Sequence, residues 1–471
     1  MWDSGSSVGE ITGQSKTILT CDFKPTRPYR IITGGEDFTA CWFEGPPFKF
    51  KKSLTEHSRF VTCTRFSPNG EKVATVGLDK KGIIWDGKTG DKLVELTGHT
   101  LGVYSVSWSP DSQQLITASA DKTVRLWDAA SGECLTTFDL SFGSNSVDYQ
   151  QLGCLWHQDY LVSVGLNGNI YYLDRAHPNE PRLVIKGHNK FVTALAADPS
   201  RGHVYTGSYD SLIIRWDIAT GASETLTGNG HSNQIQRLKV AGETLVSAAM
   251  DDSVRFNFTN SGAYGDAVST DSSPQDIAVS RDASLTVAVT LKSVVVLRNG
   301  RTASTLNVSF QPTSVAISPD SRTVAVGGKD NKVHLYALNG DNLSETRVLD
   351  KHRGALTAVE FSPSGEFLAT ADSEKRDIIV WNTSDYSVKV EGWCFHTAAV
   401  RSIAWTSDSL KLASGSLDQD VYVWNVNHPS KRIHISRAHQ GGVNAVAWLD
   451  DLTLATAGQD MSWKTWTVTH L

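Results

Sequence analysis

Residues 82–89, GIIWDGKT, match the phosphate-binding pattern G-x-x-x-x-G-K-[ST], with Gly82, Gly87, Lys88 and Thr89 in the four required places. That pattern binds a nucleotide when small residues wrap its phosphates in backbone N–H groups at the start of a helix. Here two isoleucines and a tryptophan lie between the glycines, and these residue types favour a β-strand. Gly90 would also break a helix in its first turn. The sequence therefore argues against a nucleotide hydrolase and predicts a strand followed by a turn.

A second group of chemically capable residues, a histidine, a hydroxyl, an aspartate and a tryptophan, occurs five times at fixed spacing. The aspartate follows the histidine by 22 residues, or by 21 in the last copy. The hydroxyl residue lies four residues before the aspartate, and the tryptophan lies six residues after it. The five copies are His57, Thr75, Asp79 and Trp85; His99, Thr117, Asp121 and Trp127; His188, Thr206, Asp210 and Trp216; His396, Ser414, Asp418 and Trp424; and His439, Thr456, Asp460 and Trp466.

These quartets contain the groups of a Ser-His-Asp hydrolase, but such an enzyme needs one activated nucleophile in one cleft. The same groups recur here along the whole chain, so we interpret them as structural. The units resemble WD repeats, and that resemblance implies that the groups form a hydrogen-bond network, in which each buried bond contributes about 0.5 to 1.5 kcal/mol. We therefore predict no catalytic residues and no enzyme activity.

The elements that position these quartets repeat about every forty residues, with eleven units between Gln14 and Leu471. Within a unit, short apolar or alternating runs are separated by turn residues, as in 114–119 (QLITAS) and 123–127 (TVRLW). This pattern is similar to that of WD repeats. It predicts an all-β WD40 β-propeller in which the tryptophan lies on the third strand of each blade and segments such as 92–96 (KLVEL) lie outermost.

Composition excludes several classes of function. A net charge of −6 over 471 residues argues against a broad nucleic-acid surface. The sequence has no apolar run long enough for a membrane span and no signal peptide at its start, so we expect a cytoplasmic protein that contacts neither membrane nor nucleic acid. Its six cysteines form no C-x-x-C pair and no metal-ligand cluster, and we expect no metal and no cofactor.

Several segments outside the repeat pattern resemble the actin-interacting protein 1 family. They are 23–37 (FKPTRPYRIITGGED), 43–51 (FEGPPFKFK), 57–61 (HSRFV), 150–156 (QQLGCLW) and 447–460 (AWLDDLTLATAGQD). The resemblance runs from end to end of the chain. It implies a cytoplasmic, cytoskeletal protein that binds actin filaments together with cofilin/ADF and promotes filament severing and disassembly. A generic WD-repeat scaffold, such as a substrate receptor of a ubiquitin ligase, is the alternative.

The resemblance also places four residues on an actin- and cofilin-binding surface: Glu36, Asp37, Phe50 and Phe60. Each has a structural alternative except Glu36, which has no role in the repeat. Asp37 occupies the repeat's aspartate position. Phe50 alternates with lysines as in a half-buried outer strand, and Phe50 and Phe60 fit core packing as well as they fit a binding surface.

The same resemblance implies two seven-bladed propellers, of which this chain would lack about three N-terminal repeats. We therefore expect an N-terminally truncated form, from a splice variant or a truncated gene model. Residues 1–181 would form a partial first propeller of about four blades with a bare apolar sheet face at each end. Residues 182–471 would form a complete seven-bladed propeller, with 182–187 (RLVIKG) as the outer strand of its last blade.

Overall fold

The computed structural model describes residues 2–3, 6–7 and 12–469. Within these ranges the regular structure is β-sheet apart from two short 3-10 turns, η1 (Val147–Tyr149) and η2 (Pro199–Arg201). The prediction of an all-β propeller fold is thus confirmed. The chain forms two compact units, Met1–Lys186 and Gly187–Leu471.

The first unit contains four consecutive four-stranded antiparallel sheets, preceded by a short pair formed by β1 (Trp2–Asp3) and β2 (Ser6–Ser7). The strands of the four sheets are β3 (Ile18–Phe23), β4 (Arg30–Gly35), β5 (Ala40–Glu44) and β6 (Lys49–Leu54); β7 (Val61–Phe66), β8 (Lys72–Gly77), β9 (Gly82–Asp86) and β10 (Lys92–Leu96); β11 (Val103–Trp108), β12 (Gln114–Ser119), β13 (Thr123–Asp128) and β14 (Cys134–Asp139); and β15 (Gln151–His157), β16 (Tyr160–Gly165), β17 (Ile170–Leu173) and β18 (Leu183–Ile185).

The second unit contains six further four-stranded sheets and a last sheet of three strands. Their strands are β19 (Val192–Asp198), β20 (His203–Ser208), β21 (Ile213–Asp217) and β22 (Ser223–Thr225); β23 (Ile235–Ala241), β24 (Thr244–Ala249), β25 (Ser253–Phe258) and β26 (Asp266–Ser269); β27 (Asp276–Val279), β28 (Leu285–Val289), β29 (Ser293–Arg298) and β30 (Arg301–Asn307); β31 (Pro312–Ile317), β32 (Thr323–Gly328), β33 (Val333–Asn339) and β34 (Asn342–Leu349); β35 (Leu356–Phe361), β36 (Phe367–Asp372), β37 (Ile378–Asn382) and β38 (Val388–Val390); β39 (Val400–Trp405), β40 (Lys411–Ser416), β41 (Val421–Asn425) and β42 (Arg432–Ile435); and β43 (Val443–Trp448), β44 (Thr453–Gly458) and β45 (Trp463–Thr467).

The phosphate-loop match forms the predicted strand and turn. Gly82 to Asp86 are the third strand, β9, of their sheet, and β10 pairs with it as the outermost strand. The carboxylate of Asp86 accepts hydrogen bonds from the backbone N–H groups of Lys88 and Thr89, both at 2.7 Å. Because a turn rather than a helix follows β9, these residues do not form a phosphate-binding loop.

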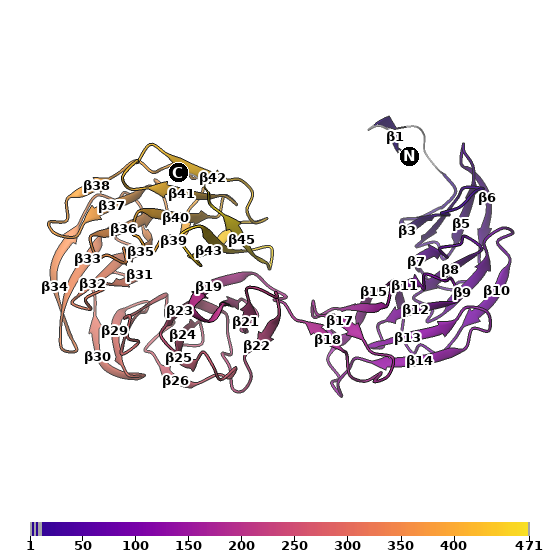
Figure 1. Ribbon diagram of the computed structural model, residues 1–471, viewed down its shortest axis with the longest axis horizontal. Coiled ribbons are helices and arrows are strands. Elements are labelled where there is room, and N and C mark those ends of the chain that lie inside the picture. The colour runs from indigo at the N-terminus through magenta and orange to yellow at the C-terminus, as the bar shows by residue number, and fades with distance from the viewer. Residues whose placement is uncertain (1, 4–5, 8–11, 470–471) are drawn as a thin grey trace. The chain divides into compact units, whose positions relative to one another are not determined.

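The seven sheets of the second unit close into a ring around a central axis (Figure 1). The last sheet packs against the first through buried residues that include Val192 and Ala457. The side-chain amide of Asn444 donates a hydrogen bond of 2.7 Å to the backbone oxygen of Val192, and the rings of Trp216 and Trp463 lie 6.0 Å apart. Closure therefore comes from side-chain packing and one polar contact between the first and last sheets.

The expectation that residues 182–187 complete the last sheet of the second unit was wrong. Strand β18 instead pairs with β17, so it is the outer strand of the fourth sheet, and Leu183 lies opposite Tyr172. Pairing with the neighbouring strand closes a short loop, whereas pairing with β45 would bring together segments far apart in sequence at a larger entropic cost. The last sheet consequently has three strands.

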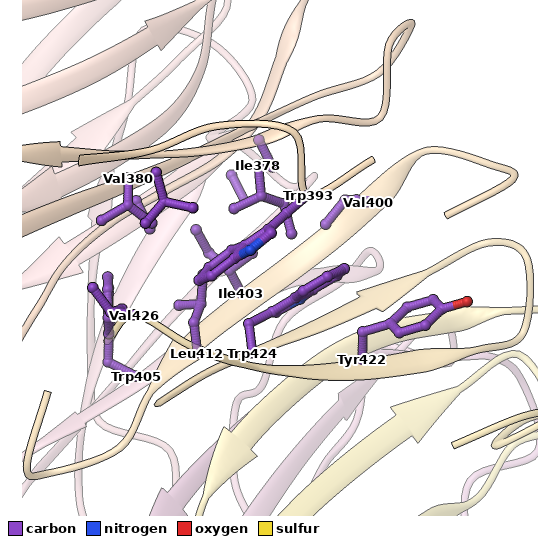
Figure 2. Close-up of a cluster of buried hydrophobic side chains, with 14 residues drawn as sticks. Ile378, Val380, Trp393, Val400, Ile403, Trp405, Leu412, Tyr422, Trp424 and Val426 are labelled. Atoms are coloured by element: carbon purple, nitrogen blue, oxygen red, sulfur yellow. The ribbon is translucent and has the colours of Figure 1, made fainter. Parts of the chain in front are cut away.

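The core lies between neighbouring sheets. Figure 2 shows one such layer, between the sheets β35–β38 and β39–β42, where the indole rings of Trp393 and Trp424 stack with centroids 5.0 Å apart. Ile378, Val400 and Leu412 pack around them. The alternation of each strand sends every second side chain into such a layer, and this explains why both faces of most sheets are apolar.

The two end sheets of the first unit differ in how their outer faces are covered. On the fourth sheet, Leu155, Val162, Tyr172 and Leu183 form one row across all four strands, and the two leucines are 55% and 49% exposed. The bare apolar face predicted there is confirmed.

The bare face predicted on the first sheet is wrong at its centre. Ile31, Cys41 and Phe43 are buried beneath Phe48, and the thiol of Cys41 contacts the backbone oxygen of Gly13 at 3.6 Å. The N-terminal segment and the loop before β6 thus cover the middle of this face. Only its rim remains exposed.

Candidate functional site

The predicted quartets form hydrogen-bonded chains that join each second and third strand to the loop before the sheet. In the second sheet, Trp85 Nε1 donates to Thr75 Oγ1 at 2.9 Å, Thr75 Oγ1 lies 2.8 Å from His57 Nε2, and His57 Nδ1 lies 2.9 Å from Asp79 Oδ2. Because an ionised carboxylate only accepts, His57 Nδ1 carries the proton and Nε2 accepts from the threonine hydroxyl. The chain of donors therefore runs from tryptophan to aspartate.

The same geometry recurs in the other four predicted copies. The histidine Nδ1 to aspartate distances are 2.8 Å for His99, 3.0 Å for His188, 2.9 Å for His396 and 2.7 Å for His439. The hydroxyl-bearing residues are fully or almost fully buried, and each is hydrogen-bonded to both the histidine and the tryptophan. A buried hydroxyl with both partners in place is a structural fastener, and it offers no surface from which a nucleophile could attack a substrate.

The aspartates are held in their ionised form. Burial alone would raise the pKa of Asp418, but hydrogen bonds from His396 and from the backbone N–H groups of Thr397 and Asp420 outweigh burial and lower it to about 2. In the third sheet the same balance, with the hydroxyl of Thr123 as an additional donor, holds the pKa of Asp121 well below its usual range. These carboxylates therefore remain ionised at neutral pH and act as hydrogen-bond acceptors within the fold.

Two further networks escaped the spacing rule. His231 contacts Ser247 and Asp251, with Asn257 donating to the serine where other sheets have tryptophan. His352 contacts Thr370 at 2.7 Å and Asp372 at 3.0 Å, and Trp381 donates to the same threonine. These networks follow the same chemistry at altered spacings. In both, the aspartate follows the histidine by 20 residues, and in the second Asp372 also follows Thr370 by only two. A search for histidines about twenty residues before any Asp would have found both.

The first sheet carries a variant network around Asp37. Gln14 takes the place of the histidine and its side-chain amide donates to Asp37 Oδ1 at 3.3 Å, while the N–H of Ser15 donates to Oδ2 at 2.9 Å. Burial would raise the pKa of Asp37, but these bonds and those from Thr39 lower it. The carboxylate of Asp37 therefore has a structural role, because its hydrogen bonds hold the turn.

Glu36 lies at this same turn, between β4 and β5, and Phe60 packs against the turn from the loop between β6 and β7. Glu36 is half-buried, its N–H donates to the backbone oxygen of Thr17 at 3.0 Å, and its carboxylate has no hydrogen-bond or ion-pair partner among the described residues. Phe60 stacks on the ring of Phe38 with centroids 5.7 Å apart and an interplanar angle of 28°. The ammonium of Lys16 lies 5.9 Å from the Phe38 ring. An unpaired acid and an exposed aromatic ring, Phe38, thus lie in one turn, and the half-buried ring of Phe60 packs on Phe38 from the loop before β7.

Phe38 is the residue of this turn that the sequence analysis missed. It is 38% exposed and has a φ of 68°, a left-handed conformation that bulky residues rarely adopt. The position after the repeat aspartate has positive φ in other sheets too, but there it holds residues such as Lys80, Lys122 and Gln419. The positive φ is therefore a feature of the repeat turn, and what distinguishes this sheet is a partly exposed aromatic ring at that position, a residue type enriched at protein interfaces.

Phe50 is not part of this group. It lies on β6, where it pairs with Phe43 and packs edge-on against that ring at 5.9 Å. The turn adjoins Ala40, three residues from Phe43 along β5, so Phe50 lies about 10 Å away along the strand, toward its other end. Its 48% exposure leaves it on the surface, but it makes no hydrogen bond or ring contact with Glu36, Asp37 or Phe60.

The described residues contain neither a cluster of metal-ligand side chains nor a helix suited to crossing a membrane. No three histidine, cysteine or acidic side chains in that part of the chain converge as a metal site would require. No helix there has the length and apolar character needed to cross a membrane.

Comparison with known proteins identifies both the repeat and several relatives. The family model "WD domain, G-beta repeat" matches residues 48–86, 90–128, 179–217, 302–336, 343–382, 389–425 and 430–467. The 66 kDa stress protein of Physarum polycephalum is 53% identical over 99% of this chain and 78% of its own. WD repeat-containing protein 1-B of Xenopus laevis is 43% identical over 100% of this chain and 78% of its own. Actin-interacting protein 1 of Drosophila melanogaster is 39% identical over 89% of this chain and 69% of its own.

Proposed function

The chain belongs to the actin-interacting protein 1 family of WD-repeat proteins, and from that premise we propose that it binds actin filaments and cooperates with cofilin in their severing and disassembly. The similarity to relatives named for actin interaction, which spans most of the chain, carries this proposal. It does not favour the alternative of a generic scaffold or ubiquitin-ligase receptor.

The proposed mechanism uses binding energy alone. A surface that fits a cofilin-distorted filament better than an undistorted one shifts the filament population toward the distorted state by its difference in affinity. Such a protein needs no catalytic residue, no cofactor and no metal. We further propose that it acts in the cytoplasm on the actin cytoskeleton.

We propose that the actin-facing contact is formed by Glu36 and Phe38 of the turn between β4 and β5, together with Phe60 of the loop before β7. An aromatic side chain contributes large apolar area at low entropic cost, and such residues dominate binding energy at protein interfaces. The carboxylate of Glu36 is available to a basic partner group because no described residue pairs with it. Asp37 supports the turn, and Phe50 lies on a separate part of the same sheet.

The test is sedimentation of actin filaments with this chain, with and without cofilin. We expect the chain to increase the unsedimented actin only when cofilin is present. Phe38→Asn should reduce this effect by about tenfold or more, since a central aromatic contact is worth roughly 2 kcal/mol or more. Asn tolerates a positive φ, so this variant should remain folded.

Met461→Asn is the matched control. Met461 also follows a repeat aspartate, has a φ of 61° and is 48% exposed, but it lies in the last sheet of the second unit. Disassembly should be unchanged in this variant. Equal losses in both variants, or in neither, would reject the turn as the contact, whereas a wild-type chain without effect on cofilin-decorated filaments would reject the proposed function itself.

A further inference from the structure

A cavity of about 490 Å³ opens at one end of the central channel of the second unit, where the first strands of the seven sheets converge. Its lining is polar: five glutamines, three threonines, a serine, an asparagine and a tyrosine contribute to it. The only charged residues that line it are cationic, namely Arg237, Lys329 and Arg401. Its volume is in the range of small-molecule sites in proteins.

Arg401 differs from the residue that three other sheets of the second unit carry at the same place. It is the bulged residue near the start of its first strand, between Val400 and Ser402. At the equivalent bulge, Thr193, Thr313 and Thr357 each use the hydroxyl to bond a carbonyl of the second strand of their own sheet, at 3.1, 2.9 and 3.2 Å. In β39, Arg401 has no hydroxyl to make this bond, and its guanidinium lines the channel instead.

The guanidinium of Arg401 has no acceptor or acidic partner among the described residues. Arg237, beside it, is already paired: its Nε donates to Asp276 Oδ1 at 3.0 Å, and its terminal nitrogen donates to the backbone oxygen of Arg401 at 3.4 Å. Desolvation by the surrounding protein, and then the charge of Arg237, lower the pKa of Arg401. The side chain of Arg401 is nevertheless solvent-exposed, so its guanidinium is accessible from solution, and the second cation beside it adds to the positive charge that an anion would meet there.

The acidic residues of the channel, Asp276 and Glu360, do not line the outer cavity. Deeper in the channel, a second cavity of about 250 Å³ includes Asp276 and Glu360 in its lining. Asp276 is used by Arg237, and Glu360 pairs with Lys239 at 3.5 Å. Arg401 lines this deeper cavity as well as the outer one, but each carboxylate has another cation as its partner, so Arg401 and Lys329 have no ion-pair partner among the described residues.

From this arrangement we propose that the mouth of the channel is a binding site for a small phosphorylated molecule, with Arg401 as the principal ligand and Arg237 and Lys329 as supporting cations. The planar fork of a guanidinium matches two phosphate oxygens, and charge-assisted bonds of this kind are the strongest that side chains make. The side-chain amides of Gln236 and Gln311 supply neutral donors on the same lining. This site lies in the second unit and is independent of the turn at Phe38.

The test is isothermal titration of the full chain with inorganic pyrophosphate, and with citrate as a carboxylate of comparable charge. We expect pyrophosphate to bind more tightly than citrate, with an affinity that falls as salt is added. Arg401→Thr should weaken pyrophosphate binding at least about tenfold. This variant restores the residue type found at the same bulge in three other sheets, so it should fold at least as stably as the parent.

Arg322→Gln is the matched control, since Arg322 is exposed and lies in the same unit but not on the channel. Its pyrophosphate affinity should equal that of the parent. No binding to the parent chain, unchanged binding in Arg401→Thr, an equal loss in Arg322→Gln, or tighter binding of citrate would each overturn the proposal. Because the readout is a small-molecule affinity, none of these outcomes depends on actin.

Discussion

At the scale of single residues, the repeat network converts common polar side chains into parts of the core. Each aspartate accepts several hydrogen bonds, so its ionised form is stabilised more by the folded state than by water. For a carboxylate with a lowered pKa, the extra stability is fully present above the unfolded pKa and is lost as the pH falls through the folded value. The network should therefore make the fold sensitive to acid.

Asp418 provides the first test. Its pKa falls from 3.8 to about 2, and its side chain is only 5% exposed. We expect Asp418→Asn to lower the free energy of unfolding at neutral pH by about 2 kcal/mol. The variant should also lose less stability than the parent between about pH 4 and pH 2. Urea unfolding at several pH values measures both effects, with the exposed Asp350→Asn as a control that should follow the parent.

Sequence could locate these residues only where spacing and residue type were kept. The five regular quartets were predicted. Ser247 and Asp251 were identifiable only as a degenerate copy, with Asn257 in place of a tryptophan, and the network of Asp372 was recognised only from its contacts. Phe38 was missed for a different reason. Its significance depends on a backbone angle and on stacking with Phe60, neither of which is visible in a pattern of residue types.

At the scale of strands and sheets, alternation predicted the order of strands within each sheet, including the third-strand position of the tryptophan. It did not predict the partner of β18. A three-residue apolar strand fits the edge of many sheets, and its partner is decided by which edge lies near enough to close the loop at low entropic cost. Because β18 pairs with β17, the fourth sheet has four strands. One apolar face of that sheet remains exposed.

That face gives the second prediction. Leu155→Lys combined with Leu183→Lys should lower the binding of a dye that reports exposed apolar surface, because both leucines belong to the row that crosses the sheet. Folding stability should change little, since both side chains are already about half exposed. Dye fluorescence and the thermal midpoint are the two measurements. Leu135→Lys, at a 44% exposed leucine on the third sheet, should leave dye binding nearly unchanged.

At the scale of the whole chain, the two compact units have buried clusters of their own. In the first unit these clusters include Ile116 and Trp127, and in the second they include Leu412 and Trp424. The second unit closes its ring by packing its last sheet on its first, so both of these sheets are covered on both faces. The fourth sheet of the first unit lacks that cover. Per residue, the first unit therefore gains less from burial of apolar area.

The third prediction is that thermal unfolding occurs in two transitions, the first unit unfolding at the lower temperature. A matched pair of substitutions, one in each unit, shows which transition belongs to which unit. Trp127 and Trp424 are both buried and donate Nε1 to Thr117 and Ser414, at 2.8 and 2.9 Å. Each Trp→Phe change removes one buried hydrogen bond, at a cost of about 1 to 3 kcal/mol, and so should shift one transition by several degrees.

Differential scanning calorimetry of the full chain measures these shifts. Trp127→Phe should lower only the first transition and Trp424→Phe only the second, because each tryptophan stabilises the cooperative unit that contains it. If both variants moved a single shared transition by similar amounts, the two units would be unfolding as one and the separation inferred from their cores would be wrong. If instead Trp424→Phe moved the lower transition, the closed ring would be the less stable part, and packing between the first and last sheets would contribute less than their buried area implies.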